Sequence, residues 1–258
     1  MVGRGFATVA LAAGLGLAAG CSKPAPPPAP APVTPAPAPA SGAISGRVLF
    51  EGDRVPEAKP LRLTTDPYCE RAHPKGLIDD HYRINARREV ADAVVYIRSG
   101  LPEGVKYPVP AEPVALDQVG CRYVPKVFLI RVGQTLRLET SDATLHNVHA
   151  QGHANRSFNL GMPNAGMILE RVFDRPEVPV RFQCDVHPWM AAYAAVLDHP
   201  FGAVTGEDGA YALEGLPDGI YDVEVWHSRL GRSTASVRIE RGAAVTQDFR
   251  LVAPVRSF

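Results

Sequence analysis

The sequence has no excess of charge of either sign. Lysine and arginine together number 27, as do aspartate and glutamate, in a chain of 258 residues. A surface that binds nucleic-acid phosphates needs a basic excess, so this balance argues against a nucleic-acid partner. It argues equally against an acidic disordered chaperone. Cysteine is scarce, with four residues in the chain, which makes the position of each cysteine informative.

The N-terminal region lacks an apolar run long enough to cross a bilayer. Phe6–Ala19 is apolar but short, as in the hydrophobic part of a secretory signal, and predicts a signal peptide in residues 1–20. The segment Leu17-Ala-Ala-Gly-Cys21 resembles the lipobox of bacterial lipoproteins, although its leucine stands one position early. The resemblance implies lipid on Cys21 and a place on the periplasmic face of a membrane, with Ser22 favouring the outer membrane. Ordinary cleavage that leaves a free cysteine is the alternative.

A proline-rich stretch separates this start from the rest of the chain. Residues 21–43 are mostly proline and alanine, with nine prolines between positions 24 and 39. Such a composition cannot pack a core and favours polyproline II, which would extend to roughly 50 Å at about 3.1 Å per residue. We expect a disordered tether that holds the folded part, residues 44–254, away from the membrane.

The cysteine count leaves an odd number once Cys21 is taken as the lipid anchor. Export places Cys69, Cys121 and Cys184 in an oxidising compartment, where thiols tend to pair. We assign Cys69 and Cys121 to each other as a disulfide because their surroundings carry no other signal. Two buried free thiols are the alternative. Cys184 is left as a candidate metal ligand.

Sustained helical periodicity is absent, whereas strand patterns recur. Apolar and polar residues alternate with period two at positions 136–140 and 178–184. Residues 93–97 and, apart from Arg131, residues 127–132 are apolar runs. High glycine and proline contents suit many turns between short strands. The sequence therefore predicts an all-β fold of the sandwich type.

A second β unit begins near His199. Residues 208–226, DGAYALEGLPDGIYDVEVW, resemble the carboxypeptidase regulatory-like module, which is a small transthyretin-related (prealbumin-like) sandwich. We therefore expect a metal domain at 111–198 and a regulatory-like sandwich at 199–254. Residues 44–110 form a β segment that could complete either one, and Ile44–Pro56 looks like the first strand of the regulatory-like module.

Two segments carry candidate metal ligands. Cys184, His187 and Met190 lie at spacings of three on one loop between predicted strands, and His146 follows another strand upstream. Two imidazoles, one thiolate and one thioether are the ligand set of a blue-copper site, in which methionine is a weak axial ligand. Zinc would accept two histidines and one cysteine, but methionine is a poor zinc ligand. Asp185 could supply an oxygen, which keeps zinc as the alternative.

Here the sequence resembles a known family. His146-Asn-Val-His149 followed by Cys184-x-x-His-Pro-x-Met190 is similar to cupredoxins of the amicyanin and pseudoazurin type, over residues 126–197. The resemblance implies a Greek-key sandwich and one type 1 copper ion, with His146, Cys184 and His187 equatorial and Met190 axial. It also implies that Asn147 braces the cysteine loop, and that the exposed edge of His187 exchanges electrons.

The resulting prediction is a membrane-tethered type 1 copper protein that transfers electrons to or from a redox protein. No acid–base pair or substrate site stands out in the sequence, so we do not expect an enzyme. Two alternatives remain: a copper protein for storage or delivery, and a structural or polymer-binding surface lipoprotein. His149 and His153 are interpreted as surface residues, and His227 as structural.

Overall fold

The computed structural model describes residues 41–63 and 66–253. The predicted signal peptide at 1–20, the predicted lipid site Cys21 and the predicted tether up to residue 40 lie outside these ranges. The described chain is all-β apart from one short helix, as the sequence predicts. Within the described ranges no helix combines the length and apolar character that a membrane span requires.

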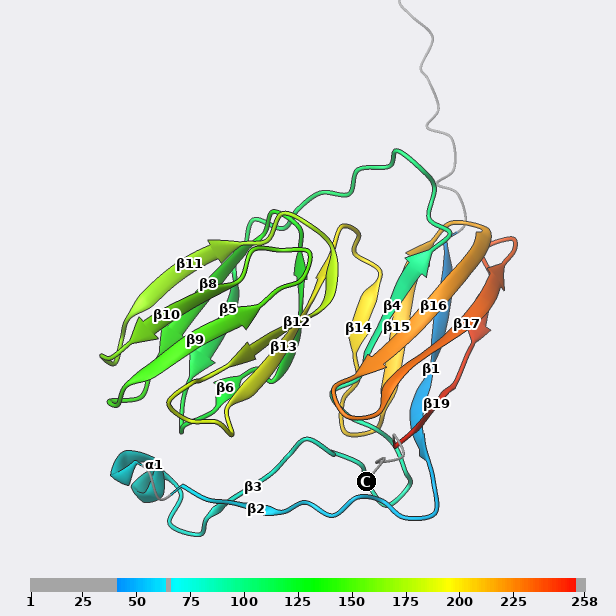
Figure 1. The fold of residues 1–258 in the computed structure, drawn as a ribbon. Coiled ribbons are helices and arrows are strands. Elements are labelled where there is room, and N and C mark those ends of the chain that lie inside the picture. Colours follow the sequence, from blue (N-terminus) through cyan, green and yellow to red (C-terminus); the bar gives the residue numbers. More distant parts are fainter. Residues whose placement is uncertain (1–40, 64–65, 254–258) are drawn as a thin grey trace, which may run out of the picture. The chain divides into compact units, whose positions relative to one another are not determined.

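Residues 114–197 form a β-sandwich, here called sandwich A (Figure 1). One sheet has the order β10-β9-β12-β13-β7 and the other has the order β11-β8-β5-β6. Most neighbouring strands are antiparallel, but β13 pairs with β7 and β5 pairs with β8 in parallel. The strands are β5 (Val114–Gln118), β6 (Tyr123–Val124), β7 (Val127–Arg131), β8 (Thr135–Thr140), β9 (His146–Gln151), β10 (Phe158–Met162), β11 (Ile168–Val172), β12 (Glu177–Gln183) and β13 (Ala191–Leu197).

The core of sandwich A follows from the period-two pattern of its strands. On β8, Leu136 and Leu138 are fully buried, while Arg137 between them is half-buried. On β12, Val180 and Phe182 point into the same core, and Arg181 is exposed. Alternate side chains of a strand lie on opposite faces, so each sheet presents one apolar face to the other.

A second sandwich, sandwich B, combines strands from both ends of the described chain (Figure 1). In one sheet β1 pairs with β15, β18 and β19, and the other sheet has the order β14-β4-β16-β17. Thus β1 and β4, both from the segment at 44–110, belong with the C-terminal unit. The strands are β1 (Gly42–Glu51), β4 (Val94–Ser99), β14 (Gly202–Val204), β15 (Ala210–Leu216), β16 (Gly219–His227), β17 (Gly231–Ile239), β18 (Ala244–Thr246) and β19 (Phe249–Val252).

One part of that segment, around a short helix, contacts sandwich A instead. It holds β2 (Pro60–Leu61), helix α1 (Pro67–Ala72) and β3 (Leu77–Ile78), with β2 and β3 paired antiparallel. Asp66 is the N-cap of α1, and its carboxylate accepts the backbone N–H of Tyr68, while proline occupies the first turn. A disulfide from Cys69 to Cys121 attaches the helix to the loop between β5 and β6, so α1 is held over one end of sandwich A.

Candidate metal centre

The predicted ligands come together at one end of one sheet. His146 and Asn147 begin β9, and Cys184 follows the last residue of β12. These strands are neighbours, with Gln183 opposite His149, so their ends meet. His187 and Met190 lie in the loop that leads from Cys184 to β13.

The loop from Cys184 to Met190 is a closed turn. The Cys184 backbone N–H donates to the Met190 carbonyl at 3.3 Å, and the Met190 N–H donates to the His187 carbonyl at 2.9 Å. The His187 N–H in turn points to the Cys184 sulfur at 3.4 Å. These bonds bring residues spaced by three back towards one point, as the sequence predicts for so short a loop.

Three ligand atoms converge inside this end of sandwich A. The two Nδ1 atoms of His146 and His187 are 2.9 Å apart, and His187 Nδ1 is 3.8 Å from the Cys184 sulfur. One ligand atom from each residue lies within 4.8 Å of the others. Both histidines are fully buried, and Met190 is buried in the same apolar core as Cys184.

Neighbouring side chains hold the cysteine loop in place. The side-chain oxygen Oδ1 of Asn147 accepts the Asp185 N–H at 2.7 Å and lies 3.3 Å from the Cys184 thiol. Tyr123, which the sequence analysis did not identify, donates its hydroxyl to the carbonyls of Asn147 and Gln183 and so ties β9 to β12. Burial raises the pKa of this hydroxyl well above its usual value, so it remains a donor.

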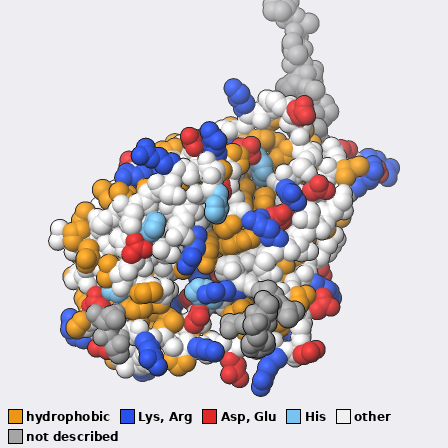
Figure 2. Space-filling model, in the orientation of Figure 1, with side chains coloured by type: hydrophobic (Ala, Val, Ile, Leu, Met, Phe, Trp, Pro, Cys, Tyr) orange, Lys and Arg blue, Asp and Glu red, His pale blue; other side chains and the backbone are white. Residues whose placement is uncertain are grey.

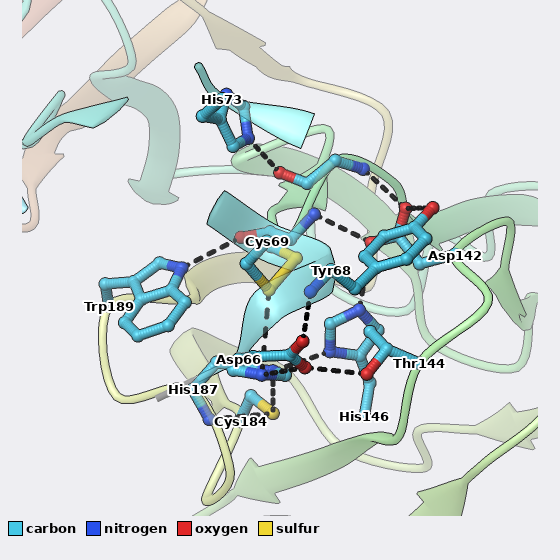
Figure 3. Close-up of a disulfide and its surroundings, with 12 residues drawn as sticks. Asp66, Tyr68, Cys69, His73, Asp142, Thr144, His146, Cys184, His187 and Trp189 are labelled. Atoms are coloured by element: carbon cyan, nitrogen blue, oxygen red, sulfur yellow. Dashed lines mark hydrogen bonds and ion pairs between the residues drawn. A yellow bond between two sulfur atoms is a disulfide. The ribbon is translucent and has the colours of Figure 1, made fainter. Parts of the chain in front are cut away.

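The two histidines have carboxylate partners on their outer side. His187 Nε2 lies 3.0 Å from Asp66 Oδ2, and His146 Nε2 lies 2.9 Å from Asp142 Oδ2 (Figure 3). Because a carboxylate accepts hydrogen bonds, each Nε2 carries the proton and each Nδ1 presents a lone pair. Two lone pairs that face each other at 2.9 Å require a cation between them, either a proton or a metal ion. The donor set therefore fits a metal ion.

In the metal-free site, electrostatics favour the neutral forms of Cys184 and His187. Burial raises the pKa of the Cys184 thiol, although backbone N–H groups from Asn147, Val186 and His187 oppose that shift. Burial, followed by the proximity of His146, lowers the pKa of His187. A neutral buried imidazole is a metal ligand, and a buried thiol becomes a thiolate when a metal binds it.

The expectation of an exposed His187 edge is wrong. The residue is 0% exposed, because α1 and its disulfide cover the outer side of the ring. The Cys69 sulfur lies 3.7 Å from His187 Nε2, and the indole of Trp189 donates to the Cys121 carbonyl at 3.0 Å (Figure 3). The motif alone could not reveal this cover, since it comes from a segment far upstream.

The nearby His149 does not join this cluster. Its Nδ1 lies 3.1 Å from Asp185 Oδ1 on the partly exposed side of the sheet. Hydrogen bonds from His149 and then from Gln183 lower the pKa of Asp185 to about 2. Asp185 is therefore ionised and engaged with these side chains and with Asn147 and Asn159.

No protein-family model and no curated protein matches this sequence. Solved structures with a similar part include a copper-containing nitrite reductase from Thermus scotoductus SA-01, at 23% identity and TM-score 0.31, covering 38% of this chain and 25% of that one. A purple cupredoxin from Nitrosopumilus maritimus matches at 23% identity and TM-score 0.28, covering 32% and 98%. A single-residue mutant of amicyanin in its Cu(I) form matches at 20% identity and TM-score 0.29, covering 40% and 97%. The match thus spans a quarter of the nitrite reductase.

Proposed function

We propose that this protein binds one copper ion of type 1 through His146, Cys184, His187 and Met190, and that it transfers electrons. The observation that carries the proposal is the convergence of two imidazole Nδ1 atoms and one thiol sulfur in a buried space. A buried methionine closes the same loop. Two histidines and one cysteine with a methionine as weak fourth ligand suit copper better than zinc, which prefers a carboxylate, cysteine or histidine in that position.

When bound, copper would supply a one-electron couple. The chain supplies a site that need not rearrange when the charge changes. Strands β9 and β12 fix the ends of the loop, while Asn147 and Tyr123 hold it by hydrogen bonds. Exclusion of water from these buried residues strengthens the electrostatic interactions at the site. Such a fixed, dry site suits electron transfer.

The biological setting is part of the same proposal. Lipid on Cys21 would anchor the chain to the periplasmic face of a bacterial membrane, with the outer membrane favoured. Sandwich A would act as a cupredoxin that exchanges electrons with a redox protein, and sandwich B would serve as a regulatory-like support. We propose a carrier of electrons, not an enzyme.

The test is titration of the purified chain with Cu(II), followed by visible spectroscopy and redox cycling. We expect one copper per chain, an intense copper–thiolate band and its reversible loss on reduction. Binding of Cu(I) alone, with rapid exchange to a chelator, would favour a storage or delivery role instead. Preference for Zn²⁺ over copper would contradict the copper assignment.

A further inference from the structure

Both imidazoles of the candidate metal centre donate from Nε2 to a carboxylate. Asp66 Oδ2 lies 3.0 Å from His187 Nε2, and Asp142 Oδ2 lies 2.9 Å from His146 Nε2. The side chains of His146, His187 and Asp142 are at most 3% exposed, and that of Asp66 is 15% exposed. Neither aspartate belongs to the ligand set, so their placement on the ligands' outer nitrogens needs its own explanation.

Asp66 is held in position by three donors. Its Oδ1 accepts the Tyr68 N–H at 2.7 Å, and its Oδ2 accepts the Thr144 hydroxyl at 2.6 Å in addition to His187. These three hydrogen bonds fix the orientation of the carboxyl group beside His187.

Asp142 is held by a different set of donors. Its Oδ1 accepts the Gly120 N–H at 2.8 Å and the Tyr68 hydroxyl at 3.1 Å. Its Oδ2 accepts the Cys121 N–H at 2.7 Å as well as the His146 ring. Together these hydrogen bonds fix the orientation of the buried Asp142 side chain, with its Oδ2 directed at Nε2 of His146.

Helix α1 and the loop that holds Cys121 are covalently joined, and together they carry donors to both carboxylates. Cys69 of α1 is joined to Cys121, whose own N–H holds Asp142, and Tyr68 bonds to both aspartates (Figure 3). His73 adds a contact from the end of α1 to the Gly120 carbonyl at 2.6 Å. The disulfide thus fixes α1, Asp66 and Asp142 as a unit against the two histidines.

We propose that Asp66 and Asp142 are positioning residues that hold the Nε2–H tautomer of both histidines, aim their Nδ1 lone pairs inward and favour Cu(II) over Cu(I). The inference rests on the proposed function. A carboxylate that accepts the outer N–H of a ligating imidazole fixes its ring orientation and makes it a stronger electron donor. Stronger donation stabilises the more highly charged ion, so two such partners should lower the reduction potential.

The size of the effect can be bounded. Loss of a hydrogen-bond partner of a metal-ligating histidine typically costs ten- to a hundredfold in metal affinity. If the affinity for Cu(II) alone falls tenfold, the one-electron reduction potential rises by about 59 mV. Asp66→Asn retains the shape of the side chain but has only one acceptor oxygen. Because the amide is also uncharged, it weakens the bond to His187 even when that oxygen faces the ring.

The experiment compares the full-length copper-loaded protein with Asp66→Asn and Asp142→Asn by voltammetry. Asp198→Asn is the charge control, because Asp198 follows the end of β13 remote from the ligand loop. Thr144→Val removes a donor to Asp66 but keeps the carboxylate. We expect the copper–thiolate band in all variants, a potential higher by tens of millivolts in both site variants, and a smaller shift in Thr144→Val.

A second measurement does not depend on any variant. In the wild-type protein loaded with Cu(I), which is diamagnetic, ¹H–¹⁵N spectra should show slowly exchanging Nε2–H protons on His146 and His187. An unprotonated Nε2 on either ring would overturn the inference. So would a potential in Asp66→Asn equal to that of Asp198→Asn while the visible band is retained. A wild-type protein with no copper–thiolate band would instead refute the proposed function.

Discussion

At the scale of single residues, Cys184 has two roles that can be separated. Its sulfur is a candidate ligand, and its side chain also fills part of the core of sandwich A. Serine keeps the size of the side chain but cannot form the copper–thiolate bond. We therefore expect Cys184→Ser to lose the visible band while retaining the native circular dichroism spectrum. A variant that kept the band would show that another group is the ligand.

Met190 should tune the site without being essential to it. The thioether is a weak and distant ligand in sites of this type, and leucine fills a similar volume, so the cost in stability should stay below about 1.5 kcal/mol. We expect Met190→Leu to bind copper with a higher reduction potential than the wild type. Voltammetry measures the shift, and Met167→Leu, partly buried against the same core, provides the matched control. Complete loss of copper in Met190→Leu would contradict the axial role.

At the scale of secondary-structure elements, the closed turn from Cys184 to Met190 could be predicted from the sequence. Cys184, His187 and Met190 are close in the chain, and a short loop between paired strands leaves few ways to arrange them. His146 could be placed only by the resemblance to a family, because its approach depends on the pairing of β9 with β12. Local spacing is readable in a sequence, whereas strand partners are not.

The residues of α1 that cover His187 could not be predicted from local spacing. Asp66-Pro67 has the features of a helix start and nothing that links it to a ligand, so neither Asp66 nor α1 was identified as part of the site. Asp142 precedes His146 by four residues, yet its orientation depends on N–H groups of the loop that holds Cys121. The same non-local pairing places β1 and β4 in sandwich B. The strand patterns alone could not reveal this.

The disulfide should be the main interaction that holds α1 against sandwich A. Cys69 and Cys121 are separated by 52 residues, for which chain-entropy reasoning gives roughly 4 kcal/mol of stabilisation. We expect the double variant Cys69→Ser/Cys121→Ser to lower the free energy of unfolding of the copper-free protein by up to that amount, as measured in urea. Limited proteolysis should then cleave near α1 first. Equal protease resistance in the variant and the wild type would show that other contacts are sufficient to hold the helix.

At the scale of the whole molecule, each sandwich has its own apolar core. Acidic and basic side chains are interspersed on the face that Figure 2 shows, in agreement with the zero formal net charge. We therefore expect weak non-specific electrostatic attraction to a polyanion. Any change of stability with pH should arise from particular buried groups, not from general charge repulsion.

Histidines outside the candidate metal centre, buried or partly buried, supply such groups. Burial is the largest cause that lowers the pKa of His81, His199 and His227, and the pKa of His227 falls to about 4. His227 is 1% exposed, and its Nδ1 accepts the N–H groups of Arg229 and Leu230 at 3.2 Å. In the folded protein the His227 ring therefore stays neutral under mildly acidic conditions, while in the unfolded chain it takes up a proton.

The sign of the pH dependence follows from this difference. Below the unfolded value of about 6.5, the unfolded state binds more protons than the folded state, so the free energy of unfolding falls as pH falls. For His227 alone the loss should approach about 3 kcal/mol near pH 4. Urea unfolding of the copper-free protein between pH 7 and 4 measures it, and His227→Asn, which can still accept one N–H, should flatten the slope. The copper spectrum at pH 7 should be the same in His227→Asn and the wild type. A slope unchanged by the substitution would show that His227 is not a source of the acid sensitivity.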